Sequence, residues 1–174
     1  MKRYALSVAI ALLAAAQGAV AAPPDRYGTA EPFASEAVYF VLTDRFVNGD
    51  PANDHRDQGG ENRTFDRPLM GANGVPDNIG YLGGDFRGIL DNADYIREMG
   101  FTSVWITPIV DNPDEAFAGG FRIGEAFFAD KGKTGYHGYW GVNFYRVDEH
   151  LESQGLTFAD FTRRMRDEYG LKTV

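Results

Sequence analysis

The chain has 174 residues, of which 44% are hydrophobic and 14% aromatic, and this composition argues against intrinsic disorder. Its net charge of −8, from 17 Lys and Arg against 25 Asp and Glu, argues against nucleic acid as a partner. The absence of cysteine excludes disulfides and thiolate metal sites. The length fits one domain or part of one, and the acidic charge fits a neutral ligand or a bound cation.

The first 21 residues have the pattern of a signal peptide. Lys2 and Arg3 give a positive start, residues 5–16 form an apolar run, and residues 19–21 (Ala-Val-Ala) fit a cleavage site of small residues. The apolar run is too short to span a bilayer, which disfavours the alternative of a membrane anchor. We therefore expect a secreted or periplasmic protein that has no membrane contact after cleavage.

An irregular arm precedes the first expected strand. Residues 22–36 contain three prolines and no periodic pattern, so we expect them to form a mature N-terminal arm. Residues 37–43 have the composition of a strand. The uninterrupted apolar run from Val38 to Leu42 predicts that this strand is buried on both faces, as in a parallel sheet. Residues 44–84 then form a long loop, and loops of that length inside a domain usually have a function.

Four oxygen-bearing side chains follow the first strand closely, those of Asn48, Asp50, Asn53 and Asp54. Hard cations such as Ca²⁺ take about six to eight oxygen ligands, and Asp and Asn supply them. Gly, Pro, Asn and Asp also dominate ordinary turns. The local sequence alone favours a turn, and a cation site stays open as the alternative.

A helix and a second strand come next. Asp85 fits the N-cap position, and Gly100 fits the left-handed position after the last helical turn. Residues 102–107 are expected to form a buried strand that ends at Pro108, so strand, helix and strand predict a βαβ unit with parallel strands. Residues 110–150 are expected to form a second long loop. The apolar stripe of the helix consists of Ile89, Leu90, Ala93, Ile96 and Met99.

A second helix and the start of a third strand end the chain. Thr157 fits the N-cap position, Asp160 fits its capping-box partner, and Gly170 ends the helix. Residues 171–174 are expected to open the third strand. The apolar side of this helix consists of Phe158, Phe161, Met165 and Tyr169.

These elements match the first part of a (β/α)8 TIM barrel or of a doubly wound sheet. A nucleotide-binding sheet would have a G-x-G-x-x-G motif after the first strand, and the chain has none there. The long loops follow the strands, which is where barrel enzymes build their sites. We therefore favour an α/β chain with the first two βα units of a TIM barrel and the start of the third strand, with open strand edges.

The densest group of functional candidates lies in the glycine-flanked loop 135–141, which contains Tyr136, His137, Tyr139 and Trp140. Aromatic faces stack on sugar rings, and a ring N–H can donate a hydrogen bond to a sugar hydroxyl. The loop therefore predicts a saccharide platform. Large aromatic side chains can instead fold back over the core, and the residues alone leave both interpretations open.

The other charged candidates have simpler interpretations. Asp44 and Arg45 predict a buried ion pair that holds the base of the first loop. We expect His55 and His150 at the surface. The chain's other carboxylates could be proposed as a catalytic acid and base, but sequence spacing does not establish the distance between two carboxyl groups. We therefore expect the remaining carboxylates to be surface or loop charges, namely Asp111, Asp114, Asp148 and Glu149.

Four segments in order carry a resemblance to a known family. Residues 39–54, 81–89, 99–108 and 135–140 resemble the α-amylase family of glycoside hydrolases (family 13), and look closest to secreted α-amylases and cyclodextrin glucanotransferases. The resemblance covers most of residues 37–174. It implies a (β/α)8 catalytic barrel that acts on α-1,4-glucans, such as starch and maltodextrins, with retention of configuration.

The resemblance also implies a structural Ca²⁺ site, and so favours a cation over a simple turn after the first strand. The implied substrate subsite is formed by Tyr136, His137, Tyr139 and Trp140. His137 would bond a sugar hydroxyl, Tyr139 would stack on the ring, and Trp140 would support the loop. The implied calcium ligands are Asn48, Asp50, Asn53, Asp54, the carbonyl of Gly83 and the carboxylate of Asp85.

The catalytic residues of the family, a nucleophile Asp, an acid/base Glu and a third Asp, are expected beyond Val174. We therefore expect an N-terminal part of the enzyme that binds an α-glucan oligo- or polysaccharide, is monomeric, and is inactive alone. The alternative from another functional class is a non-catalytic, calcium-stabilised saccharide-binding protein.

Overall fold

The structure is a computed structural model that describes residues 32–59, 64–65, 69–70, 76–77, 80–115, 117–118 and 131–174. The chain divides into two compact units, Met1–Ser35 and Glu36–Val174. The predicted signal peptide, residues 1–21, and most of the predicted N-terminal arm lie outside the described residues. The described part of the first unit is the 3₁₀ helix η1 (Pro32–Ser35). No helix among the described residues is long and apolar enough to cross a membrane.

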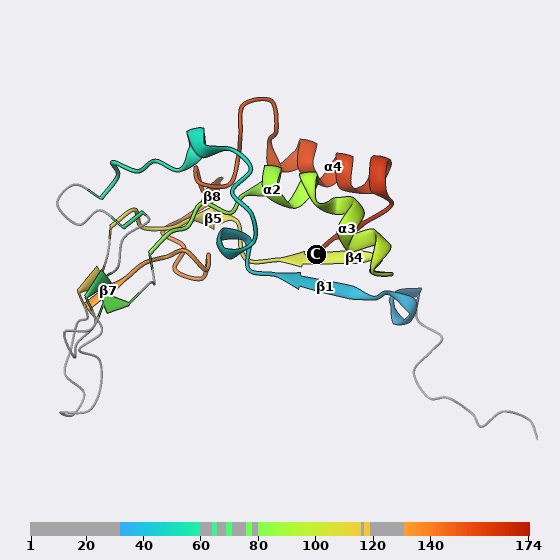
Figure 1. Cartoon of the computed structure of the whole chain (residues 1–174), viewed down its shortest axis with the longest axis horizontal. Coiled ribbons are helices and arrows are strands. Elements are labelled where there is room, and N and C mark those ends of the chain that lie inside the picture. Colours follow the sequence, from blue (N-terminus) through green and yellow to red (C-terminus); the bar gives the residue numbers. More distant parts are fainter. Residues whose placement is uncertain are drawn as a thin grey trace, which may run out of the picture. The chain divides into compact units, whose positions relative to one another are not determined.

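The second unit is built on a parallel sheet in the order β1-β4-β9 (Figure 1). Val38 lies opposite Ser103, and Val104 lies opposite Thr173. The predicted βαβ unit and third strand are therefore confirmed, with shorter strands than the sequence indicated. Within the described residues this sheet does not close into a barrel. Its strands are β1 (Val38–Val41), β4 (Ser103–Ile106) and β9 (Lys172–Thr173).

The helices lie on one side of this sheet (Figure 1). The predicted first helix is in fact two short helices, because the chain leaves the helical conformation at Asn92 (φ −111°), whose side chain donates to the Gly88 carbonyl. Met99 lies beyond the last turn and is 43% exposed, so its predicted place in the apolar stripe is wrong. The helices are α2 (Phe86–Asp91), α3 (Ala93–Glu98) and α4 (Phe158–Tyr169).

The predicted helix caps are confirmed. The Asp85 carboxylate accepts the backbone N–H of Gly88, and Thr157 and Asp160 form a complete capping box. Gly170 ends α4 with φ +69°, a left-handed conformation that favours glycine. The termini of both helical segments are thus set by local sequence.

The core lies between the helices and one face of the sheet. The rings of Phe86 and Phe161 stack with centroids 4.9 Å apart, and both residues are fully buried. Burying such a side chain contributes about 1.5–3 kcal/mol. The rest of the core consists of Val41, Ile89, Leu90, Ala93, Ile96, Val104, Ile106, Leu151, Leu156, Met165 and Leu171.

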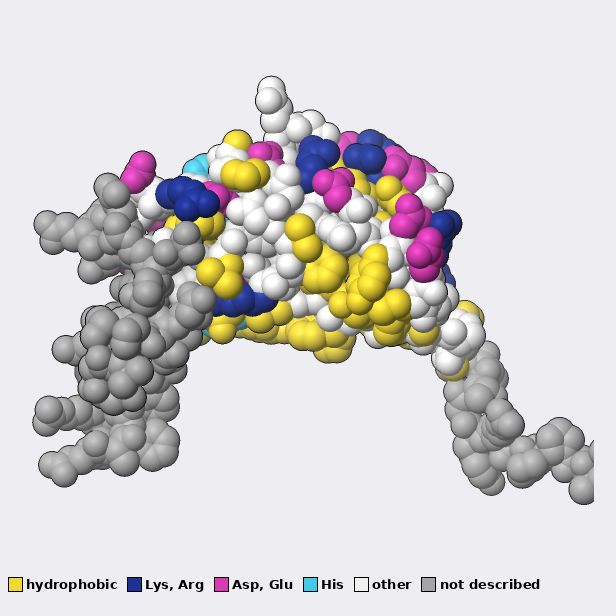
Figure 2. All heavy atoms as spheres, viewed as in Figure 1, with side chains coloured by type: hydrophobic (Ala, Val, Ile, Leu, Met, Phe, Trp, Pro, Cys, Tyr) yellow, Lys and Arg dark blue, Asp and Glu magenta, His cyan; other side chains and the backbone are white. Residues whose placement is uncertain are grey.

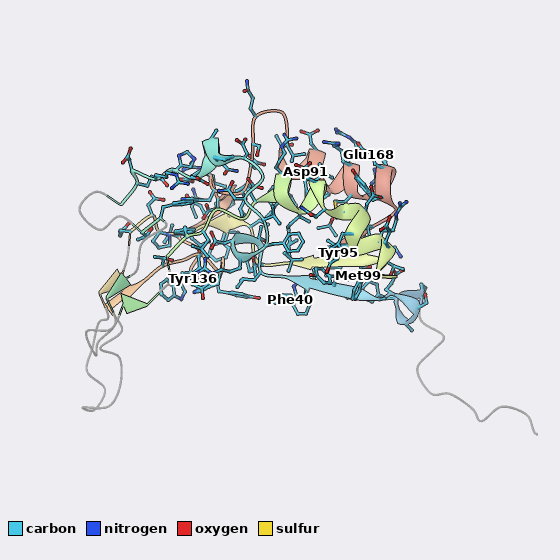
Figure 3. The ribbon with its side chains drawn as sticks, viewed as in Figure 1. Phe40, Asp91, Tyr95, Met99, Tyr136 and Glu168 are labelled. Carbon is cyan, nitrogen blue, oxygen red and sulfur yellow. The ribbon has the colours of Figure 1, made fainter. Side chains whose placement is uncertain are left out.

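The other face of the sheet is open. Phe40 is 53% exposed and Trp105 is 48% exposed, and their rings meet edge to face at 5.2 Å. Figure 3 shows Phe40 on the side of β1 away from the helices, and Figure 2 shows hydrophobic side chains gathered on that side. The prediction that the first strand is buried on both faces is therefore wrong for this chain, because the described helices cover one face only.

Each long segment after a strand has structure of its own. Residues 44–84 are here called the first loop segment and residues 110–150 the second. Both predicted long loops contain short strands, because β2 and β3 pair antiparallel in the first and β5 with β8 and β6 with β7 do so in the second. The first segment contains most of η2 (Thr43–Arg45) and all of η3 (Pro51–Asn53), β2 (Leu69–Met70) and β3 (Pro76–Asp77). The second contains β5 (Val110–Asp111), β6 (Phe117–Ala118), β7 (Lys131–Lys133) and β8 (Asn143–Val147).

Candidate functional site

The first loop segment folds around the carboxylate of Asp85. Its Oδ1 accepts the backbone N–H groups of Gly49 (3.1 Å) and Gly88 (2.6 Å). Its Oδ2 accepts from the backbone N–H of Asp50 (2.9 Å) and from Asn53 Nδ2 (3.1 Å). Burial raises the pKa of Asp85, and these donors oppose that effect. One side chain therefore caps α2 and holds the start of the loop.

Asn48, Asp54 and Gly83 meet beside this cluster. Asn48 Nδ2 donates to Asp54 Oδ1 (2.7 Å), and Arg56 pairs with Asp54 Oδ2 (2.8 Å). Gly83 has φ +87°, and a Cβ there would lie 2.4 Å from Asn48 Nδ2 and 2.6 Å from Asp54 Oδ1. The sixth predicted ligand, Asp50, turns its carboxylate to the Ala52 N–H (3.0 Å). The chain thus brings all six predicted residues into one region.

Two buried oxygens test whether this cluster suits a cation. Asn48 Oδ1 and Asn53 Oδ1 are buried and have no hydrogen-bond partner within the described residues. Buried polar atoms nearly always have a partner, so each of these oxygens has the capacity to bind an ion. The described residues contain no group of three or more His, Cys, Asp or Glu with metal-site spacing. The available donors are amide, carbonyl and carboxylate oxygens, which fit a hard cation such as Ca²⁺ and not zinc.

Asp44 and Arg45 join the bases of the two segments. They form the predicted ion pair, and Asp44 Oδ1 also accepts the backbone N–H groups of Leu82 (3.0 Å) and Gly83 (3.1 Å). Burial raises the pKa of Asp44 to about 6, against the lowering effect of Arg45. The Arg45 guanidinium lies 3.7 Å from the ring centroid of Tyr136, so it also contacts the second segment.

The glycine-flanked loop 135–141, here called the aromatic loop, leaves two of its four ring side chains at the surface. Tyr139 is 61% exposed and Trp140 is 36% exposed, so for them the alternative of folding back over the core is wrong. Tyr136 and His137 are half-buried, and the rings of His137 and Trp140 are perpendicular at 4.9 Å. Gly138 (φ +79°) lets the loop approach Pro108, two residues after β4, because a Cβ there would lie 2.1 Å from the Pro108 oxygen.

His137 uses one ring nitrogen within the loop and carries its proton on the other. Its Nδ1 accepts the backbone N–H of Tyr139 (3.0 Å), so the neutral ring carries its proton on Nε2. Burial lowers the pKa of His137, and the charge of Arg45 lowers it further. A neutral imidazole with a free Nε2–H suits a hydroxyl acceptor.

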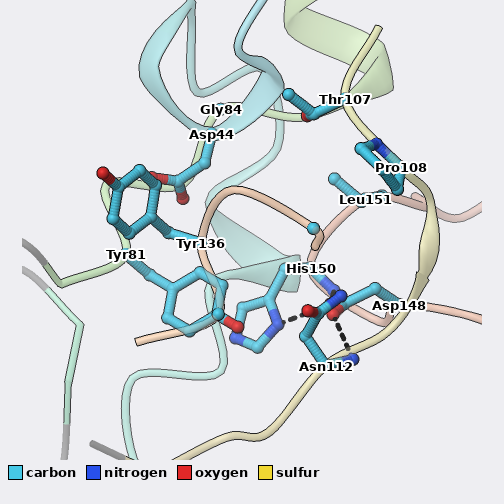
Figure 4. A pocket seen from close by; sticks show the side chains of 12 residues that line it. Asp44, Tyr81, Gly84, Thr107, Pro108, Asn112, Tyr136, Asp148, His150 and Leu151 are labelled. Carbon is cyan, nitrogen blue, oxygen red and sulfur yellow. Dashed lines mark hydrogen bonds and ion pairs between the residues drawn. The ribbon is translucent and has the colours of Figure 1, made fainter. Parts of the chain in front are cut away.

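His150 was expected at the surface and Asp148 as a surface or loop charge, and the structure contradicts a surface position for either. Each is 5% exposed, because the two side chains bond to each other and lie under residues distant in sequence (Figure 4). The Tyr81 ring stacks on His150 at 4.3 Å with an interplanar angle of 7°. The Asp-x-His spacing is a weak signal that could have indicated the pair. His55, Asp111, Asp114 and Glu149 are at least partly exposed, as expected.

A small cavity lies between the two loop segments (Figure 4). Its lining includes Asp44, Tyr81, Tyr136, Asp148 and His150. The volume of about 10 Å³ is at the lower limit of what one water molecule needs. The aromatic loop therefore rests on a polar, nearly filled base.

The comparisons with known proteins agree with this geometry. The family model "Alpha amylase, catalytic domain" matches residues 40–166. A cyclomaltodextrin glucanotransferase of Klebsiella oxytoca is 34% identical over 172 residues, which are 98% of this chain and 22% of that protein. An α-amylase of Saccharomycopsis fibuligera is 33% identical over 145 residues, which are 81% of this chain and 23% of that protein.

Solved structures give the same result. A cyclomaltodextrin glucanotransferase with a three-domain ABC distribution is 32% identical with a TM-score of 0.56, covering 80% of this chain and 24% of that one. An Anoxybacillus α-amylase is 35% identical with a TM-score of 0.51, covering 80% of this chain and 23% of that one. The chain thus spans about a quarter of these relatives, and its three parallel strands correspond to part of a TIM barrel. The family match and these relatives show that the chain belongs to the α-amylase family of glycoside hydrolases.

Proposed function

We propose that the chain is the N-terminal part of the catalytic barrel of a retaining glycoside hydrolase or transglycosylase that acts on α-1,4-glucans. The observation that carries this proposal is the aromatic loop, which presents Tyr139 and Trp140 to solvent at the C-terminal end of β4. Barrel enzymes build their sites at that end of their strands. Two relatives are named as glucanotransferase and amylase, which supports the substrate class.

The residues of this loop would bind sugar rather than cleave it. Tyr139 offers an exposed ring face for stacking on a glucose unit. His137 offers an Nε2–H to a sugar hydroxyl, because its Nδ1 is already used by the loop backbone. Arg45 lies over Tyr136 and fixes that ring at the base of the platform. The chain's own contribution to the reaction is thus to bind and orient the glucan.

Cleavage would need further chain, because the 174 residues span 22% of the glucanotransferase that they match. We expect no release of reducing sugar from soluble starch by the 174-residue chain alone, and release would contradict this proposal. The coding sequence beyond Val174 decides between the enzyme and a non-catalytic saccharide-binding protein. An Asp and a Glu on later barrel strands are required for the enzyme.

We also propose that the first loop segment holds a structural Ca²⁺. Two observations support it: the unpartnered buried oxygens of Asn48 and Asn53, and the close approach of Gly83 to Asn48 and Asp54. The ion would tie the first loop segment to the start of α2. Its ligands would be Asn48, Asp50, Asn53, Asp54, the carbonyl of Gly83 and Asp85.

The calcium proposal is tested on the full chain by thermal unfolding in EGTA and in saturating CaCl₂ or MgCl₂. At a Ca²⁺ concentration about 100 times Kd, binding adds about 2.7 kcal/mol to the free energy of unfolding. We expect Ca²⁺ to raise Tm by several degrees and Mg²⁺ to raise it much less, because Mg²⁺ prefers a smaller octahedral site. An unchanged Tm in Ca²⁺ would contradict the site.

Export is a separate proposal that depends on the first 21 residues. Their charged start, apolar run and small residues support a signal peptide. N-terminal sequencing of the exported protein should begin at Ala22. A product that keeps residues 1–21 and stays with the membrane would contradict this.

A further inference from the structure

Residues 136–140 are here called the saccharide platform. A series of buried hydrogen bonds connects the platform to residues behind it, and Asn112 is the first of these residues. The Asn112 Oδ1 accepts the backbone N–H of Trp140 (2.9 Å). The Nδ2 of the same amide donates to the Val110 carbonyl (2.5 Å), which assigns the oxygen to the Trp140 side. Asn112 is 3% exposed. The position of the Trp140 backbone therefore depends on a buried side chain that is not part of the platform.

Asp148 fixes Asn112 in turn. Its Oδ2 accepts the backbone N–H of Asn112 (2.9 Å), as the dashed lines of Figure 4 show. Its Oδ1 accepts from the backbone N–H of His150 (3.0 Å) and lies 2.8 Å from His150 Nδ1. Both carboxylate oxygens are thus used, and Asp148 connects His150 to Asn112.

Tyr81 contacts both His150 and the residue that follows Asn112. Its ring stacks on His150, and its hydroxyl donates to the carbonyl of Pro113 (3.2 Å), the residue after Asn112. A Cβ at Gly135, the first residue of the aromatic loop, would lie 2.8 Å from Asn112 Cβ and 3.2 Å from the Tyr81 hydroxyl. Asn112 and Tyr81 therefore limit the aromatic loop at Gly135, its first residue, and Asn112 also holds it at Trp140 near its last.

We propose that Asn112, Asp148 and His150 are positioning residues of the saccharide platform, which set its affinity for α-glucan oligosaccharides through the backbone of Trp140. This inference rests on the proposed saccharide function of residues 136–140. All three residues are almost fully buried, so they would act on the sugar only through the platform.

The charge of His150 makes this support dependent on pH. Burial alone would lower the pKa of His150, but the hydrogen bond to Asp148 and the charges of Asp148, Glu149 and Asp114 raise it above its ordinary value. The protonated ring gives Asp148 a charge-assisted hydrogen bond, which weakens when the ring loses its proton. The titratable groups that face His150 are Asp44, His55, Tyr81, Asp111, Asp114, Asp148 and Glu149.

The first arm of the test needs no sugar. The chain has three histidines, so NMR can follow each imidazole separately during a pH titration of the full chain, together with the Trp140 backbone amide. We expect the Trp140 amide to move in two steps, one with His137 at lower pH and one with His150 at higher pH. His150→Gln should remove only the upper step. A Trp140 amide that titrates identically in His150→Gln and wild type would overturn the proposal.

The control for this arm is His55→Asn. The His55 ring lies 5.5 Å from that of His150 and is exposed, and it has no role in the proposed support. Asn is chosen because His55 has φ +46°, a conformation that Asn tolerates. The upper step of the Trp140 amide should persist in this variant. Its loss in His55→Asn would also overturn the assignment to His150.

The second arm measures maltoheptaose affinity by calorimetry between pH 5 and about pH 9, a range that brackets the ordinary histidine pKa. Asp148→Asn should weaken binding about fivefold to tenfold, as expected for the loss of one buried hydrogen bond. In His150→Gln, the affinity should no longer change with pH in the range where His150 titrates in wild type. Binding like wild type in both variants at every pH would overturn the inference. If wild type binds no maltoheptaose while the Trp140 amide follows His150, the proposed function and the effect on affinity both fail, and only the coupling of His150 to the Trp140 backbone stands.

Discussion

The two loop segments both follow a strand of the central sheet, but different chemistry holds them in place. In the first segment, backbone and side-chain donors converge on the buried carboxylate of Asp85. In the second, the exposed rings of Tyr139 and Trp140 stand on a buried support of Asn112, Asp148 and His150. The first segment thus places its polar groups inside, and the second places two aromatic rings outside over a polar base.

This difference predicts how each segment responds to mutation. Removing the buried Asp85 carboxylate, around which the first segment folds, leaves several donors without partners, so the loss appears in the free energy of unfolding. Removing an exposed ring in the second segment leaves the fold intact, so the loss appears in affinity. The four predictions below test this contrast, from the largest expected effect to the smallest.

Asp85→Ala should have the largest effect. It removes the acceptor of four hydrogen bonds at a fully buried position, and we expect a loss of about 3–5 kcal/mol in the free energy of unfolding. Urea unfolding in EGTA measures this without any contribution from Ca²⁺. The matched control is Asp94→Ala, because Asp94 is 62% exposed and pairs with Arg97 at the surface of α3. A loss below about 1 kcal/mol for Asp85→Ala would remove the contrast between the segments.

Gly138→Ala should have the next largest effect, because the new Cβ would meet the Pro108 oxygen in a left-handed conformation. We expect a loss of about 3 kcal/mol. Gly170→Ala is the control: its φ of +69° is similar, nothing lies within 4 Å, and only the conformational cost of about 1 kcal/mol remains. Thermal unfolding of both variants isolates the clash. Equal losses would show that the close approach to β4 does not hold the aromatic loop.

The elements that the sequence predicts well are those with local signals. Asp85, Thr157 and Gly170 mark helix ends because caps act within four residues, and all three positions are confirmed. The parallel pairing of β1 and β4 follows from the order of elements. The break at Asn92 was missed, because an Asn side chain that bonds backward to a carbonyl competes with an otherwise regular helical pattern.

The parts that the sequence predicts poorly depend on contacts between distant residues. Tyr81 lies 69 residues before His150, and nothing in the neighbourhood of either indicates their stacking. The first strand looks buried on both faces because its apolar run is continuous, whereas burial depends on which layers are present. The cluster around Asp85 was predictable only through the family resemblance, which links residues 48–54 to Gly83 and Asp85.

A pH titration tests the base of the second segment. His150 has a raised pKa, so its contribution to stability is complete below its ordinary value of 6.5 and is lost as the pH rises through the raised pKa. Asp148 has a lowered pKa: burial would raise it, but bonding to His150 outweighs burial. Its contribution is present above 3.8 and is lost as the pH falls through the lowered pKa.

The two groups together predict maximal stability between about pH 4 and pH 6.5. We expect a loss of about 1 kcal/mol above that window, since one charge-assisted hydrogen bond weakens. Urea unfolding of His150→Gln across this range should lack the loss at high pH, and His55→Asn should keep it. A loss at high pH that survives in His150→Gln would assign it to another group.

Tyr139→Ala should have the smallest effect on stability, within about 0.5 kcal/mol, because the ring is 61% exposed. Its effect on maltoheptaose affinity should be about tenfold, which is about 1.4 kcal/mol of binding free energy, since one exposed ring face is lost. The control is Tyr145→Ala: Tyr145 lies on β8 of the same segment, is fully exposed, and belongs to no part of the platform. Calorimetry should find wild-type affinity in Tyr145→Ala. If both variants weaken binding equally, the sugar lies along the whole exposed strand. If neither does, the exposed aromatic loop is not the binding surface, and the two segments differ in construction without differing in role.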